Sequence, residues 1–354
     1  MEEVTLSLPT APEEAVRLLN RGEIRSLIKG IDLIAVVENA LRQHADEKTQ
    51  VPAEAYMSWR NSVGSYCRTL AMPGALRTGQ GEVLGLKLIN AAVSNPSRGI
   101  ARAGGFTSLF DAETARPTVI AEGALVSALR TAAYSVLSLK YLGPTTFDSV
   151  AIIGCGNLAA VHAELLSQHF PSVTCLRLFD SDRERAEALK RRWETDPTRS
   201  AIVFDALPPA LDGANVVVTV TTSDSPYIES TWLADNAFIA HVSLDDIGAA
   251  VFESAEAIFV DDIDLVSANP RRILGSLISN GSIRVRRGGD DKGSVHGTLG
   301  DVITGRVPAV RAGRGRVVSN PFGMSILDLA IISHVAEEAE RLDVGTRFRF
   351  DQDS

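Results

Sequence analysis

Cysteines, aromatic residues and long apolar runs are scarce in this sequence. Three cysteines occur among 354 residues, and no Cys-x-x-Cys pair is present, which excludes a disulfide framework and a cysteine-based zinc site. Cys155 and Cys175 are therefore interpreted as small buried hydrophobic residues. No apolar run approaches the roughly 18 residues that span a bilayer. Met1-Glu2-Glu3-Val4 lacks the basic and apolar regions of a signal peptide, so we expect a cytoplasmic protein.

Positive charge is also in short supply. The 35 Lys and Arg residues are outnumbered by 44 Asp and Glu residues, and the net charge of −9 argues against nucleic-acid or membrane partners. The six histidines have no metal-ligand spacing, so no metal site is predicted, and His162 and His334 are interpreted as packing residues. With 45% hydrophobic residues, the chain is long enough for two domains with separate cores.

A glycine turn between an expected strand and an expected helix is the most informative segment. The β-branched run 150–153 leads into Gly154-x-Gly156-x-x-Ala159, and an apolar helical pattern follows. The first glycine allows a tight turn, and the second lets the backbone approach a pyrophosphate. Asp180 ends the next expected strand, where a carboxylate accepts ribose hydroxyls. The dinucleotide-binding candidates here are Gly154, Gly156, Asn157, Leu158 and Asp180.

Short apolar runs continue beyond this turn and alternate with helical or loop segments. The expected strands are 150–153, 174–179, 201–204, 215–220, 237–244 and 257–260. This alternation indicates βαβ units, a parallel sheet and the α/β fold class.

Polar residues follow three of these expected strands. Thr221-Thr222 would line the cofactor from the same sheet edge. Asp245 and Asp246 end the run 237–244, where a carboxylate serves either as an acid or base beside a nicotinamide or as a helix N-cap. Asp261-Asp262 is assigned a structural role.

The rest of the chain predicts a discontinuous α+β domain. Helices are expected after Asp32, over 122–142 and over Met324–Leu342. Strand-like pieces lie around 65–71, 82–90 and 105–110, divided by Pro73, Gly79, Gly81 and Pro96. We expect residues 1–125 to form a substrate-binding and dimerisation domain, to which the linker helix 122–142 and a C-terminal helix of about 322–354 belong. Residues 143–321 would form a Rossmann-type domain.

Three cations in the first region interrupt apolar surroundings. They are Arg68, Lys87 and Arg130. Burying an isolated charge costs several kcal/mol unless a partner compensates. One interpretation pairs each cation with a structural carboxylate such as Glu122 or Asp111. The other places them around an anionic substrate, and the residues alone favour neither.

Several motifs, in order along the chain, resemble the ornithine cyclodeaminase/μ-crystallin family. They are Arg68…Met72-Pro73, Gly85-Leu86-Lys87, Asp111…Thr114…Pro117, Ser127-x-x-Arg130-Thr131-Ala132-Ala133, Gly154-x-Gly156, Gly297-Thr298-Leu299-Gly300-Asp301 and Ser319-Asn320-Pro321-Phe322-Gly323-Met324. The resemblance covers nearly the whole chain. It implies a homodimer built through the first domain, with NAD(P) bound at the second.

The same resemblance implies roles for individual residues. Arg68 and Arg130 would hold the substrate carboxylate with Met72 beside them, and Lys87 would polarise the reacting centre. Thr131 and Ser243 would join the cofactor site.

One departure from the family pattern indicates a particular branch. Cyclodeaminases carry Gly-Gly-Asp-x-Pro-Gly-Lys-x-Glu after the 237–244 strand, whereas this chain has His241-Val242-Ser243-Leu244-Asp245-Asp246-Ile247-Gly248. The segment resembles the branch that uses NAD to oxidise N-((2S)-2-amino-2-carboxyethyl)-L-glutamate to L-2,3-diaminopropionate and 2-oxoglutarate, for siderophores or peptide antibiotics. This resemblance implies that Asp246 is the catalytic carboxylate and that Arg102 adds a cation for a substrate with three carboxylates.

Three other functions stay open. A cyclodeaminase would release ammonia with no net change in NAD, a μ-crystallin-like protein would bind cofactor and ligand without turnover, and an imine reductase would run in the opposite direction. As to the cofactor, Asp180 would repel a 2′-phosphate, and Arg183 and Arg185 are the nearby cations. We expect NAD to be preferred over NADP by at least about tenfold.

Overall fold

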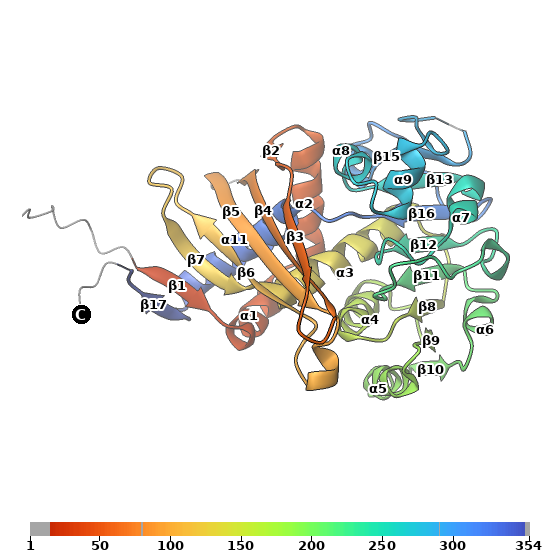
Figure 1. Cartoon of the computed structure of the whole chain (residues 1–354), viewed down its shortest axis with the longest axis horizontal. Coiled ribbons are helices and arrows are strands. Elements are labelled where there is room, and N and C mark those ends of the chain that lie inside the picture. The colour runs from red at the N-terminus through yellow and green to blue at the C-terminus, as the bar shows by residue number, and fades with distance from the viewer. Residues whose placement is uncertain (1–14, 79–80, 290, 351–354) are drawn as a thin grey trace, which may run out of the picture.

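Two β-sheets form the framework of the molecule, with helices packed against both (Figure 1). The computed structural model describes residues 15–78, 81–289 and 291–350. Met1-Glu2-Glu3-Val4 and Gly79 therefore lie outside the described residues. We call the two parts the sheet A half and the sheet B half.

Sheet A is mostly antiparallel and has the order β17-β1-β7-β6-β5-β4-β2, with β3 also paired to β4. Its strands are β1 (Val16–Leu19), β2 (Thr49–Gln50), β3 (Ala55–Arg60), β4 (Tyr66–Thr78), β5 (Gly81–Ala92), β6 (Ala103–Phe110), β7 (Pro117–Glu122) and β17 (Thr346–Phe348). The long strands β4 and β5 pair along their whole length and place Met72 directly beside Lys87.

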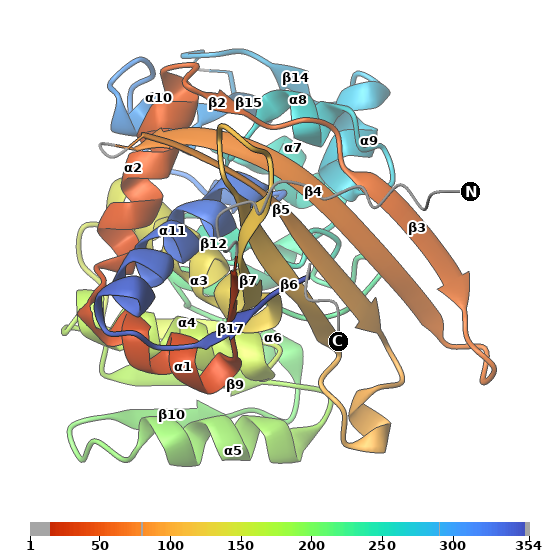
Figure 2. The same ribbon diagram turned by 90° about the vertical axis from the view of Figure 1, so that its left-hand side faces the viewer.

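The helices associated with sheet A are α1 (Arg21–Leu27), α2 (Leu33–Ala45), α3 (Gly123–Leu142) and α11 (Ser325–Arg341), with short turns η1 (Ile28–Gly30) and η2 (Pro96–Arg98). As expected, Asp32 caps α2, and α3 begins where its pattern begins, capped by Glu122. Helix α11 packs against β4, β5 and β6 (Figure 2).

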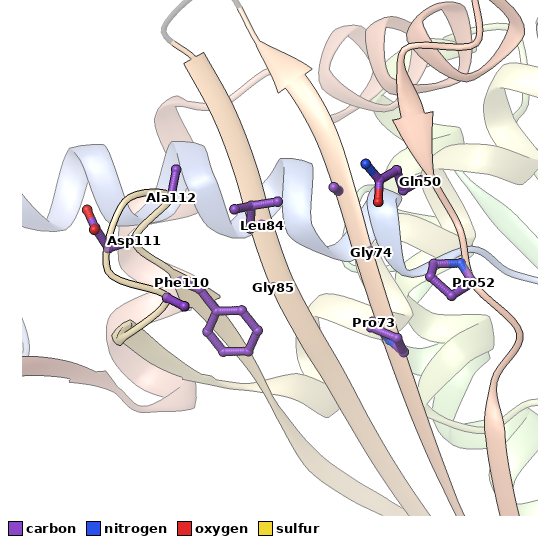
Figure 3. A pocket seen from close by; sticks show the side chains of 11 residues that line it. Gln50, Pro52, Pro73, Gly74, Leu84, Gly85, Phe110, Asp111 and Ala112 are labelled. Carbon is purple, nitrogen blue, oxygen red and sulfur yellow. The ribbon is translucent and has the colours of Figure 1, made fainter.

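Two glycines let α11 approach sheet A closely. A Cβ atom on Gly74 would lie 2.5 Å from Ser325 Oγ, and one on Gly85 would lie 2.5 Å from Leu329 Cδ2. Figure 3 shows these glycines where the helix crosses the two strands, at a cavity of about 250 Å³. None of the predicted site residues lines this cavity.

Sheet B has the order β10-β9-β8-β11-β12-β16-β13-β15-β14. Its strands are β8 (Ser149–Ile153), β9 (Cys175–Phe179), β10 (Ser200–Val203), β11 (Val216–Thr219), β12 (Phe238–His241), β13 (Ala257–Val260), β14 (Arg284–Val285), β15 (Ser294–Thr298) and β16 (Val317–Asn320). From β8 the order runs through β9 to β10, and from β11 it runs the other way through β12, so the strand order reverses between β8 and β11. The crevice between the carboxyl ends of these two strands is the place where such sheets bind ligands.

The helices of the sheet B half are α4 (Asn157–His169), α5 (Arg183–Trp193), α6 (Leu207–Leu211), α7 (Ala249–Ser254), α8 (Ile263–Ser267), α9 (Ile273–Ser279), α10 (Leu299–Ile303) and η3 (Ser230–Trp232). The pairings of sheet B are parallel, which confirms the α/β class. Within the described residues, no helix is long and apolar enough to cross a membrane.

Several sequence expectations about strands were wrong in detail. Strand β12 ends at His241 rather than at residue 244, because the chain turns there and Leu244 takes a φ of 73°. Pro73 lies inside β4 rather than ending a strand. It is tolerated because the pairing of β4 with β3 extends only to Ala71 and its pairing with β2 starts only at Ala75. The stretch around Pro73 is therefore unpaired on that side.

Two side chains are less buried than expected. Cys175 opens β9 in a half-buried position. The His334 side chain is 44% exposed and lies 3.7 Å from Glu337, so it is not a packing residue. His162 is one, because it is fully buried and hydrogen-bonded to the Leu158 carbonyl and Ser135.

Candidate active site

The glycine turn lies in the crevice between β8 and β11. Gly154 has a φ of 89°, and a Cβ there would lie 3.0 Å from the Val220 backbone and from Thr221 Cγ2. Only glycine fits this position. A Cβ on Gly156, by contrast, would meet no atom within 4 Å. The space above Gly156 is therefore open, as an approaching phosphate requires.

The start of α4 also suits an anion. Gly156 is its N-cap and supplies no side-chain hydrogen bond, and both Gly156 and Asn157 are exposed. Backbone N–H groups at a helix N-terminus bind phosphate oxygens through hydrogen bonds and the helix dipole. The residues present thus fit the pyrophosphate of a dinucleotide, with Leu158 in the same first turn.

Asp180 follows β9 and faces the glycine turn. Its Oδ2 accepts the Cys155 N–H at 2.7 Å, and its Oδ1 accepts the Asp182 N–H at 2.9 Å. Burial and the charge of Asp180 raise the pKa of the Cys155 thiol to about 12, so that thiol stays protonated and unreactive at neutral pH.

The two cations that follow Asp180 at the start of α5 are already engaged. Arg183 pairs with Asp205 and lies 3.1 Å from Glu187, and Arg185 lies 3.1 Å from Asp182. Neither Arg183 nor Arg185 is therefore paired with Asp180.

Asp246 is buried among hydroxyl groups at the ends of β11 and β12. Its carboxylate accepts the Thr221 hydroxyl at 2.6 Å and also the Ser243 hydroxyl, which is 2.9 Å from Thr219. Burial raises the pKa of Asp246, although its hydroxyl partners oppose this. A carboxyl group with a raised pKa can exchange protons closer to neutral pH.

The neighbouring Asp245 has a different environment. It forms an ion pair with Arg272 and accepts the N–H of Ile273, the first residue of α9. His241 Nε2 accepts the Asp246 N–H, and burial lowers the pKa of this histidine to about 4. Neutral His241 therefore fixes the turn that carries both aspartates.

Lys87 lies on the sheet A half, with its side chain only 2% exposed. Its Nζ is 2.8 and 2.9 Å from the two carboxylate oxygens of Asp328, and it donates to Ser127 Oγ at 2.9 Å. Arg130 Nε is 3.3 Å from Asp328 Oδ2. Burial, followed by the charge of Arg130, lowers the pKa of Lys87 to about 8.

This arrangement decides between the partners proposed for Lys87. Glu122 caps α3 and pairs with Arg21, and Asp111 binds within the turn at Thr114. Neither contacts Lys87, so both suggested partners were wrong. The partner is Asp328, which the sequence reasoning missed. Asp328 could have been singled out as unusual, because it is a charged residue within the apolar start of the last helix. Lys87 is likewise a charged residue within an apolar strand.

Arg130 is held from its other side by a turn after β16. A Cβ on Gly323, whose φ is 107°, would lie 3.0 Å from both terminal nitrogens of Arg130. Buried Asp261 accepts the N–H groups of Phe322 and Gly323. The structural role expected for Asp261 thus extends to the surroundings of Arg130.

Arg68 and Arg102 line a cavity of about 390 Å³ at one end of sheet A. Both are half-buried, and within the described residues neither forms an ion pair with a carboxylate. Burial lowers the pKa of each arginine, and the charge of Arg68 lowers that of Arg102 further. Arg68 also lies close enough to lower the pKa of Lys87.

The predicted residues thus form two groups. Lys87, Arg130, Met72, Arg68 and Arg102 gather on the sheet A half, and Gly154, Gly156, Asn157, Leu158, Asp180, Thr221, Ser243 and Asp246 gather at the sheet B crevice. Thr222 is exposed beside the second group. Thr131 donates its hydroxyl to the Ser127 carbonyl within α3.

Comparison with known proteins agrees with this geometry. The model of the ornithine cyclodeaminase/mu-crystallin family matches residues 13–342. The N-((2S)-2-amino-2-carboxyethyl)-L-glutamate dehydrogenase of Staphylococcus aureus is 29% identical, over 93% of this chain and 96% of the relative.

Solved structures give the same result. The crystal structure of CmnK has a TM-score of 0.90 at 46% identity and covers 96% of this chain and 100% of that one. An archaeal alanine dehydrogenase dimer with bound NAD has a TM-score of 0.80 at 26% identity, covering 95% and 99%. The chain belongs to the ornithine cyclodeaminase/mu-crystallin family.

Proposed function

We propose that this NAD-dependent oxidoreductase acts on N-((2S)-2-amino-2-carboxyethyl)-L-glutamate. With NAD and water, the substrate would yield L-2,3-diaminopropionate, 2-oxoglutarate, NADH and a proton. The C–N bond on the glutamate side is oxidised to an imine, which water then hydrolyses. The diaminopropionate would serve siderophore or peptide-antibiotic synthesis.

The observation that carries this choice of substrate is the excess of unpaired guanidinium groups. Arg68 and Arg102 line one cavity without carboxylate partners in the described part of the chain, and Lys87 and Arg130 share the single carboxylate of Asp328. Cations of this kind bind carboxylates through charge-assisted hydrogen bonds. A substrate with three carboxylates matches this excess better than ornithine, which has one.

Bound NAD would accept a hydride from the substrate. The N-terminus of α4 would hold its pyrophosphate, and Asp180 would hold a ribose. Arg68 and Arg130 would bind the carboxylate beside the reacting carbon, and Lys87 would polarise the reacting centre and orient the attacking water. Asp246, whose pKa burial raises, would exchange protons with the amine and the water.

We also propose a homodimer built through sheet A. Met57 and Trp59 on β3 are 58% and 45% exposed, and apolar side chains of this kind are typical of interfaces. Light scattering of the purified protein should give twice the mass of the 37.8 kDa chain. A monomer at micromolar concentration would contradict the assembly without touching the proposed reaction.

The reaction is tested by product analysis. Purified protein with the synthetic conjugate and NAD should form NADH, 2-oxoglutarate and diaminopropionate in equal amounts, without ammonia. In a parallel reaction with ornithine, NADH should not accumulate. Release of ammonia and a cyclic amino acid from ornithine, together with no turnover of the conjugate, would show a cyclodeaminase instead. Tight cofactor binding without any turnover would indicate a binding protein.

A further inference from the structure

A buried carboxylate on α11 stands between the two cations of the sheet A half. Asp328 lies in the first turn of the helix, and its side chain is fully buried. The preceding segment leads from β16 of one half to α11 of the other, past the Gly323 turn that faces Arg130. Asp328 is thus placed by both halves of the molecule.

The contacts of Asp328 fix both cations at once. Lys87 Nζ lies within 2.9 Å of both its oxygens, and Arg130 Nε lies 3.3 Å from Oδ2. Without this carboxylate, two buried positive charges would face each other and repel. With it, the cluster keeps one net positive charge, which a substrate carboxylate can balance.

We propose that Asp328 is a positioning residue for the reaction: it holds Lys87 and Arg130 at one fixed separation for the substrate. The catalytic part of this role rests on the proposed function. The geometry of the three side chains does not depend on the identity of the substrate.

The charged groups that face Lys87 decide whether its pKa rises or falls when the charge of Asp328 is removed. Arg130 from α3 and Arg68 from β4 lower the pKa of Lys87, and Asp328 from α11 is the group that raises it. From β6, the neighbour in register is the uncharged Thr107. Removal of the Asp328 charge therefore moves the titration of Lys87 below its present value of about 8.

The test compares Asp328→Asn with the wild-type enzyme. The amide keeps the size of the side chain but loses its charge. We expect kcat to fall by about tenfold to a hundredfold. The limb of the pH–rate profile that belongs to Lys87 should move toward lower pH by about one unit or more. A folded variant with an unchanged pH profile and kcat would overturn the proposal.

Two variants separate positioning from stability. Asp301→Asn is a matched control, because Asp301 is also buried but caps α10 instead of contacting Lys87. It should lower the melting temperature without moving the pH profile. If Asp328→Asn does not fold, Asp328→Glu keeps the charge on a longer side chain. Asp328→Glu should then lower kcat but leave the Lys87 limb of the pH–rate profile in place. An unchanged kcat in Asp328→Glu would overturn the proposal.

A second readout needs no substrate. In protein labelled with ¹⁵N-lysine, the ammonium signal of Lys87, assigned by its loss in Lys87→Arg, should titrate at lower pH in Asp328→Asn than in wild type. Unchanged titration would contradict the role of Asp328. No turnover of the conjugate combined with shifted titration would contradict only the proposed substrate.

Discussion

Arg98 and Arg102 lie four residues apart, but only Arg102 lines the cavity of about 390 Å³. Arg98 is exposed in the short turn η2. A guanidinium bound to a carboxylate contributes about 1.5–3 kcal/mol, which corresponds to roughly a tenfold to hundredfold change in affinity. This difference in position gives a matched pair of variants.

We predict that Arg102→Ala raises the KM for the conjugate by about tenfold to a hundredfold, whereas Arg98→Ala leaves it unchanged. Steady-state NADH formation measures both. The KM for NAD should be the same in both variants, since the cavity lies in the sheet A half. Equal KM values for the conjugate in Arg102→Ala and wild type would remove Arg102 from the substrate site.

We predict that Asp180 and Asp205 together determine the preference for NAD over NADP. Asp180 would repel a 2′-phosphate by roughly 1–4 kcal/mol, and Asp205 keeps Arg183 engaged. We predict that Asp180→Ser narrows the preference for NADH over NADPH. Adding Asp205→Ala should narrow it further, because Arg183 then keeps only Glu187 as an ion-pair partner. Calorimetric binding of both cofactors measures this effect. Equal affinity of the wild type for NADH and NADPH would contradict the role of Asp180.

At the level of single residues, the sequence identified Lys87 and Arg130 as unusual because each interrupts an apolar pattern. Asp328 is unusual in the same way, but the sequence could not pair it with Lys87, because the two residues are 241 positions apart and no local pattern links them. Asp245 and Asp246 were indistinguishable by position. Only the fold assigns the first to Arg272 and the second to the hydroxyls of Thr221 and Ser243.

At the level of secondary structure, the strand–turn–helix unit around Gly156 allows NAD binding to be tested separately from stability. A Cβ at Gly156 meets no protein atom within 4 Å, but it would occupy the space of the pyrophosphate. We predict that Gly156→Ala keeps the wild-type melting temperature within a few degrees and loses NAD affinity by about tenfold or more. Gly30→Ala is the control, since that position is equally open and lies far from the crevice in sequence. Unchanged NAD affinity in Gly156→Ala would contradict the assignment of the phosphate site to this turn.

Elements with a strong local pattern were predictable, and elements defined by long-range pairing were not. Helices α2, α3 and α11 begin within one or two residues of the expected positions because caps and apolar periodicity mark them. Strand β16 was missed, although it lies between β12 and β13 in the middle of sheet B. Its position depends on a crossover that no local pattern encodes.

At the level of the whole molecule, polar contacts join the two halves. His44 on α2 lies 2.9 Å from Asp262, and Arg271 lies 3.8 Å above the ring of Tyr56 and 3.5 Å from Glu54. These contacts connect the sheet A half, which carries Lys87 and Arg130, to the sheet B half, which carries the crevice between β8 and β11. The proposed reaction needs this connection, because the hydride must pass from a substrate on sheet A to a cofactor on sheet B.

The most direct measurement follows the hydrogen itself. The conjugate is prepared with deuterium at the α-carbon of its glutamate portion and is incubated with the enzyme and NAD. We predict that the NADH formed carries one deuterium and that the diaminopropionate carries none. Deuterium retained in an amino-acid product while the NAD stays oxidised, or NADH without deuterium, would contradict oxidation at that carbon.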